Sequence, residues 1–154
     1  KKTPFFKDFK KKIKNFKVNN KNKKIKKIIF LSEPVIGKVK KYYDERKCLS
    51  FFLKNIHLLK LKFSKISIRP HPGEKKSKFK WIKKYSNRIV ISNKKHIFND
   101  ILENDIIVGI NTVALVLGVM AKKKVISCIP TNKVKCYLPH KKILDFKKII
   151  YEKN

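Results

Sequence analysis

Short apolar runs alternate with amphipathic stretches along most of this chain. Residues 105–110 form an apolar run, as expected of a central parallel strand that is covered on both faces. Between residues 43 and 61, by contrast, Leu49, Phe52, Leu53 and Ile56 recur at helical spacing. The two patterns predict strands at residues 27–31, 64–69, 88–92, 105–110 and 124–129, and helices at residues 43–61, 79–85, 97–102, 112–121 and 143–151.

The order of these elements indicates the fold class. Strands that alternate with helices are typical of βαβ units, which form a parallel sheet with helices on both faces. We therefore predict an α/β fold with a Rossmann-like parallel sheet sandwiched between helices. In such sheets, ligands bind beyond the carboxyl ends of the strands.

Two polar turns follow predicted strands, and both are candidates for binding an anion. A strand that leads into a turn at the start of a helix gathers backbone N–H groups that can face a phosphate. The predicted strand ends would bring the two turns to one edge of the sheet. The candidate binding residues in these turns are Arg69, Pro70, His71, Pro72, Gly73, Glu74, Gly109, Asn111 and Thr112.

The same turns carry a family resemblance. Arg-Pro-His-Pro-Gly-Glu at residues 69–74, Val-Gly-Ile-Asn-Thr-Val-Ala-Leu at 108–115 and Ala-Lys-Lys-Lys-Val-Ile-Ser at 121–127 resemble the C-terminal, donor-binding half of GT-B glycosyltransferases. The chain is most similar to bacterial sialyltransferase-like enzymes and to enzymes of capsule or lipooligosaccharide synthesis, which have a His-Pro motif and a later Ser/Thr motif. The resemblance covers about residues 27 to 150.

The resemblance implies a role for particular residues. It places the phosphate of a CMP-linked sugar on His71 and on Asn111-Thr112, and a glycan acceptor on an N-terminal domain that this chain lacks. Two departures limit it: the family often has two hydroxyl residues where this chain has Asn111-Thr112, and the acidic catalytic motif of its N-terminal half has no counterpart here.

The chemistry of these residues leads in the same direction. Sugar transfer leaves a nucleotide phosphate that gains negative charge, so the site needs hydrogen-bond donors. His71 can donate an N–H as the candidate catalytic group, Thr112 a hydroxyl and backbone N–H groups, and Gly73 allows close approach of the backbone. Glu74 could accept from a ribose. The 10 carboxylates are dispersed, so we expect leaving-group stabilisation without a metal or cofactor.

Each assignment also has a purely structural alternative. His71 could simply end a strand between two prolines, and Asn111 and Thr112 are ordinary helix N-caps. Glu74 could lie in the first turn of a helix and face solvent. Arg69 could form an ion pair instead of contacting phosphate.

The formal net charge of +32 favours nucleic acid as a partner, but the composition argues against a surface that recognises nucleic acid. Among 42 basic residues, only Arg46, Arg69 and Arg88 are arginine, the residue that binds phosphate in a bidentate manner. The lysines are spread over every predicted element. We therefore do not expect sequence-specific nucleic-acid binding, whereas peripheral attraction to an anionic membrane follows from the charge.

Composition also sets expectations for domains and location. Residues 1–26 are lysine-rich and are expected to form a basic linker or frayed helix that leads from a missing N-terminal domain, while residues 27–154 form the donor-binding domain. Cys48, Cys128 and Cys136 lack paired spacing, so we expect free thiols in a reducing compartment. These features favour a cytoplasmic protein, peripheral at the inner membrane.

Three functions remain from the sequence. The first is the donor-binding domain of a glycosyltransferase of bacterial surface-polysaccharide synthesis. The second is another sugar-nucleotide or polyol-phosphate enzyme of the same architecture, such as an epimerase or a wall-polymer transferase. The third is a non-enzymatic basic module that binds RNA or a membrane, which would need exposed aromatic residues along a lysine-rich face.

Overall fold

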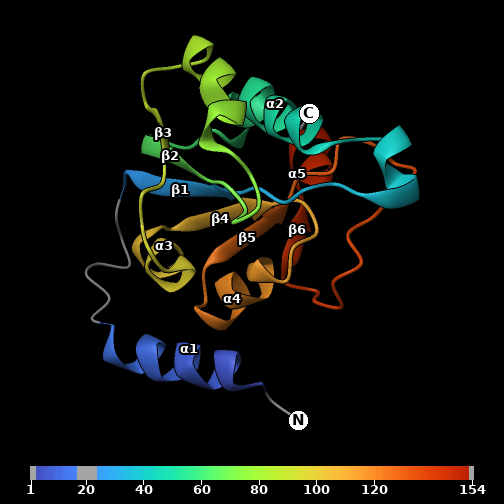
Figure 1. The fold of residues 1–154 in the computed structure, drawn as a ribbon. Coiled ribbons are helices and arrows are strands. Elements are labelled where there is room, and N and C mark those ends of the chain that lie inside the picture. The colour runs from blue at the N-terminus through green and yellow to red at the C-terminus, as the bar shows by residue number, and fades with distance from the viewer. Residues whose placement is uncertain (1–2, 17–23, 153–154) are drawn as a thin grey trace.

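The computed structural model describes residues 3–16 and 24–152. Its core is a six-stranded, fully parallel sheet with helices on both faces, which confirms the predicted Rossmann-like α/β fold (Figure 1). The strands are β1 (Lys26–Leu31), β2 (Phe63–Arg69), β3 (Ile89–Ile91), β4 (Ile106–Gly109), β5 (Lys124–Ser127) and β6 (Ile143–Asp145).

The strand order is β3-β2-β1-β4-β5-β6. The chain therefore builds outward from β1 in one direction and then returns to β1 and builds in the other. The register places Arg69, Leu31, Gly109, Ser127 and Asp145 in one row across the sheet. The predicted meeting of strand ends at one edge is thus confirmed, and the switch in direction lies between β1 and β4.

Two layers of helices bury the two faces of the sheet. One face packs against α2 (Glu45–Asn55), α5 (Phe146–Tyr151) and the 3₁₀ helices η2 (Ile56–Leu59) and η3 (Lys76–Lys84), and the other packs against α1 (Pro4–Asn15), α3 (Ile97–Glu103) and α4 (Ala114–Met120) (Figure 1). A further 3₁₀ helix, η1 (Gly37–Lys41), follows β1. Each face has its own apolar cluster, so the strands are buried on both sides as their sequences indicated.

The predicted element boundaries differ from the structure most clearly at two places. The helix expected at 143–151 begins only at Phe146, because Asp145 caps it by accepting from the Lys147 N–H at 2.9 Å, and residues 143–145 pair with β5 as a strand. The helix expected at 43–61 ends at Asn55 and continues as η2, after which Lys60 takes a left-handed conformation (φ 51°).

The helix α1 lies within the segment expected to be a linker or frayed helix. Its Phe9 is fully buried, and the Phe9 and Phe5 rings lie 4.7 Å and 4.9 Å from the ring of Phe98 on α3. This part of the segment therefore packs on the domain. No helix in the described ranges has both the length and the apolar character that a bilayer crossing requires.

Candidate functional site

The candidate site lies at the carboxyl edge of the sheet, around the switch between β1 and β4. The two predicted turns follow β2 and β4, which lie on either side of β1. Two strand spacings of about 4.8 Å separate β2 from β4 by roughly 10 Å. The structure therefore brings the His71 turn and the Asn111-Thr112 turn to the same edge, one strand apart.

Gly109 ends β4 at a point where a side chain has no room. A Cβ there would lie 3.0 Å from Leu115 Cδ2 on α4 and 3.3 Å from the Leu31 carbonyl oxygen on β1. Any larger residue would require Leu115 or the β1 backbone to shift by a few tenths of an ångström, because helix, strand and turn meet closely here. Close packing therefore explains the glycine at position 109 without any contact to a ligand.

Asn111 is the hydrogen-bonding centre of the turn after β4. Its side-chain oxygen accepts from the Tyr137 N–H at 2.9 Å and from the Cys136 thiol at 3.2 Å. Its backbone N–H donates to the Glu33 carboxylate at 2.6 Å. Asn111 thus fastens the end of β1 and the segment around residue 137 to the end of β4.

Thr112 starts the turn into α4. Its hydroxyl oxygen accepts from the Ala114 N–H at 3.3 Å, and its carbonyl accepts from the Leu115 N–H at 2.9 Å. The backbone N–H groups of Thr112 and Val113 donate to no acceptor in the described ranges. Thr112 therefore stabilises the turn before α4, whose N-cap is Val113 without a side-chain cap, and two neighbouring N–H groups remain available to an anion.

His71 lies in a turn that fixes its ring nitrogens. The Gly73 N–H donates to His71 Nδ1 at 3.1 Å, and Glu74 accepts from the His71 N–H at 2.9 Å. Because Nδ1 is an acceptor, the neutral ring carries its proton on Nε2. The residue is exposed, so this N–H can reach a ligand. Pro70 and Pro72, with their fixed φ angles, restrict the turn on both sides.

Glu74 belongs to a polar network that ties this turn to its neighbours. Its side chain is only 3% exposed, and its second oxygen accepts from Lys78 Nζ at 2.9 Å. Lys78 also pairs with Glu45, which in turn accepts from the Val35 N–H at 3.3 Å. Both oxygens of Glu74 thus have partners within the protein, and the network holds the His71 turn against η3 and α2.

Arg69 ends β2 and forms a largely buried ion pair. Its guanidinium lies 2.5 Å from an Asp100 oxygen and 3.0 Å from the Lys94 carbonyl oxygen. Asp100 is 3% exposed and also accepts from the Ser92 hydroxyl at 2.8 Å. Arg69 therefore joins the ends of β2 and β3 to α3. Its partner Asp100 lies 31 residues further along the sequence.

Glu33 also belongs to this edge; from the sequence it could be a pocket carboxylate or an ordinary turn residue at a strand end, and it was not among the selected binding residues. It lies two residues after the end of β1, and one of its oxygens accepts from the Asn111 N–H while the other has no hydrogen-bond partner in the part of the chain that the structure describes. Burial raises its pKa; the Asn111 N–H opposes this, and the charge of Glu74 adds to it. A carboxylate in the turn just after the first strand, in a chain with 10 carboxylates, was the signal available in the sequence.

Ser32 lies beside Glu33 and is 6% exposed, and its buried hydroxyl has no partner within the described residues. Cys48 and Cys128 are fully buried, Cys136 is partly exposed, and all three are free cysteines in the structure. Burial raises the pKa of Cys48 and of Cys128.

No group of three or more His, Cys, Asp or Glu side chains within residues 3–16 and 24–152 could hold a metal ion.

Comparison of the chain with protein-family models, with curated proteins and with solved structures gave no match in any of the three.

Proposed function

We propose that this chain is the nucleotide-sugar donor-binding domain of a metal-independent glycosyltransferase. The favoured donor is a CMP-sugar, and the favoured setting is the synthesis of a bacterial surface polysaccharide. The observation that supports this most is the meeting of two hydrogen-bond donor turns at the β1–β4 switch point, because ligands of parallel α/β sheets bind there. The nucleotide and the sugar class come from the resemblance of the two motifs.

The leaving phosphate is the group that these turns would stabilise. His71 Nε2–H lies on one side of β1, and the available N–H groups of Thr112 and Val113 lie on the other. Charge that develops on the phosphate as the glycosidic bond breaks is stabilised by such donors when they are already held in place. The Gly73–His71 and Glu74–His71 hydrogen bonds provide that preorganisation.

The base that activates the acceptor is the second requirement of an inverting transfer. At this edge, both oxygens of Glu74 have partners, the His71 N–H and Lys78, and Glu33 alone keeps an oxygen without a partner in the described ranges. We assign the acceptor and the catalytic base to a separate N-terminal domain, as in the enzymes that the chain resembles. On this proposal the chain alone binds the donor nucleotide and does not transfer sugar.

Calorimetric titration with CMP, UMP and cytidine tests the proposal. Hydrogen bonds to a charged group contribute about 1.5–3 kcal/mol each, so CMP should bind roughly tenfold or more tightly than cytidine. His71→Ala should weaken CMP binding by a similar factor. His71→Asn can keep an acceptor for the Gly73 N–H and separates loss of the turn from loss of the donor, and the exposed His57→Ala on η2 is the control. Equal affinity for CMP and cytidine would contradict the proposal.

A further inference from the structure

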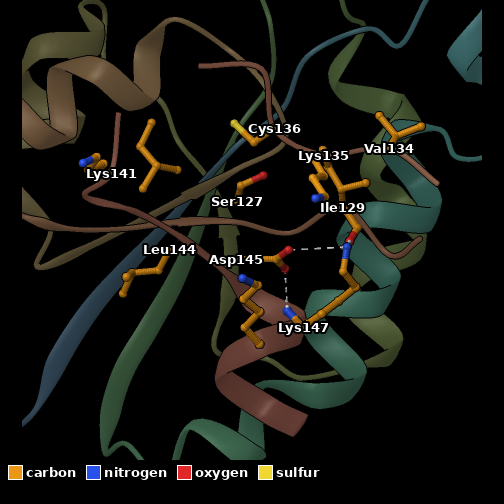
Figure 2. A pocket seen from close by; sticks show the side chains of 11 residues that line it. Ser127, Ile129, Val134, Lys135, Cys136, Lys141, Leu144, Asp145 and Lys147 are labelled. Carbon is orange, nitrogen blue, oxygen red and sulfur yellow. Dashed lines mark hydrogen bonds and ion pairs between the residues drawn. The ribbon is translucent and has the colours of Figure 1, made fainter. Parts of the chain in front are cut away.

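A cavity of about 350 Å³ lies at the β6 side of the sheet, along β6 and next to the carboxyl end of β5. Figure 2 shows Ser127 and Asp145 between Lys141 at one end of the view and Lys147 at the other. A volume of this order is at the lower end of the range for small-molecule sites. Neither of the two turns described above contributes to its lining.

The wall of the cavity is held by an internal ion pair. Lys147 is 8% exposed, and its ammonium donates to the carbonyl oxygens of Ile129 at 3.0 Å and Thr131 at 2.7 Å. The same ammonium lies 3.6 Å from Asp145, the only carboxylate in the lining. Asp145 is thus neutralised within the protein, and the segment after β5 is fixed in place (Figure 2).

The remaining charge of the lining is positive and unpaired. Four lysines and one aspartate line the cavity, so its lining carries a net charge of +3. Lys135, Lys141 and Lys148 are exposed at the rim and pair with no carboxylate of residues 3–16 or 24–152. Between them, the apolar part of the wall consists of Ile129, Val134, Ile143 and Leu144.

We propose that this cavity binds a small organic anion, in which an apolar body carries a phosphate or carboxylate group. The rim ammonium groups attract the anion, while the aliphatic wall gains from covering an apolar body. A bare inorganic anion would leave the aliphatic wall uncovered, and a neutral molecule would leave the three rim charges without a counter-ion. The cavity is therefore a second ligand site, which adjoins the proposed donor site through the hydrogen bond from the Cys136 thiol to Asn111.

Cys136 offers a way to locate the ligand. It lines the cavity and is partly exposed, whereas Cys48 and Cys128 are fully buried. Alkylation by iodoacetamide in the native protein should therefore occur at Cys136. A ligand in the cavity should slow this alkylation.

The experiment titrates the chain with phenyl phosphate, benzoate, inorganic phosphate and benzyl alcohol, by calorimetry and by protection of Cys136. We expect phenyl phosphate or benzoate to bind at least tenfold more tightly than inorganic phosphate and benzyl alcohol, and to slow alkylation. The preferred anion of the two distinguishes phosphate esters from carboxylates, and either preference upholds the site. Binding no tighter than that of inorganic phosphate, or binding without protection of Cys136, would overturn it.

A matched pair of variants separates the cavity from the general positive charge. Lys141 lines the cavity, whereas its exposed neighbour Lys142 does not. We expect Lys141→Gln to weaken phenyl phosphate binding roughly two- to fivefold, since exposed charge pairs contribute about 0.2–1 kcal/mol, and Lys142→Gln to leave it unchanged. Equal loss in both variants would show non-specific attraction and would overturn the proposal.

Discussion

Replacement of Arg69 by methionine tests whether this residue is structural. In the native fold, the guanidinium lies 2.5 Å from an Asp100 carboxylate whose side chain is 4% exposed, while that of Arg69 is 17% exposed. Arg69→Met leaves Asp100 buried with Ser92 as its remaining side-chain partner. Loss of one partner of a buried pair costs about 3–5 kcal/mol. The Ser92 hydrogen bond and the residual exposure reduce this to about 2–4 kcal/mol here.

Urea unfolding followed by circular dichroism measures this loss against the wild type. The exposed Arg88→Met is the matched control, and it should leave the unfolding midpoint unchanged because no ion pair of Arg88 occurs within the described residues. Asp100→Asn in the Arg69→Met background should recover part of the loss, since it removes the buried charge. An Arg69→Met protein that is as stable as the wild type but no longer binds CMP would refute the structural role.

Three further outcomes follow from the geometry. Gly118→Ala should lower the free energy of unfolding by about 1 kcal/mol in urea titrations. The new Cβ would lie 2.8 Å from Val125 Cγ2, and overpacking of this kind costs about 1–3 kcal/mol. This cost exceeds the stability that alanine adds through its higher helix propensity. Glu33→Gln should stabilise the fold at neutral pH and lose this advantage below pH 4.5. The pKa of Glu33 is raised in the folded state from the ordinary value of 4.5, so ionisation of its carboxyl group destabilises the fold as the pH rises above 4.5. Unfolding midpoints at pH 4 and pH 7 check the sign, and an advantage that grows on acidification would contradict it. Binding to RNA in gel shifts should be independent of sequence and should fall steeply with salt; sequence-selective binding at physiological salt would favour the nucleic-acid hypothesis instead.

The strands and their common edge were predictable because parallel strands buried on both faces leave a plain apolar signal. The run predicted as a strand at residues 105–110 contains β4 at Ile106–Gly109, and the ends of β1, β2 and β4 fall in one register row as expected. Periodicity alone could not find β6. Its three residues precede a helix of similar apolar content, and only the Asp145 cap separates the two.

Side-chain partners far apart in sequence were not predictable from one chain. The pairing of Arg69 with Asp100 and the contact of Glu33 with Asn111 join residues 31 and 78 positions apart. Both depend on strand order, which places β1 between β2 and β4. The packing of Phe9 against Phe98 likewise depends on which face of the sheet α1 covers. Sequence patterns specify elements, whereas these contacts appear only once the elements are arranged.

A heteronuclear NMR titration with CMP tests the central claim most directly, because it reports binding residue by residue. We predict that CMP shifts the amide signals of Gly73, Thr112 and Val113, and that cytidine shifts them less at equal concentration. The amides of Lys141 and Leu144, at the separate cavity, should move little. Signals that stay in place at both turns, or shifts confined to the cavity, would contradict a nucleotide site at the β1–β4 switch point.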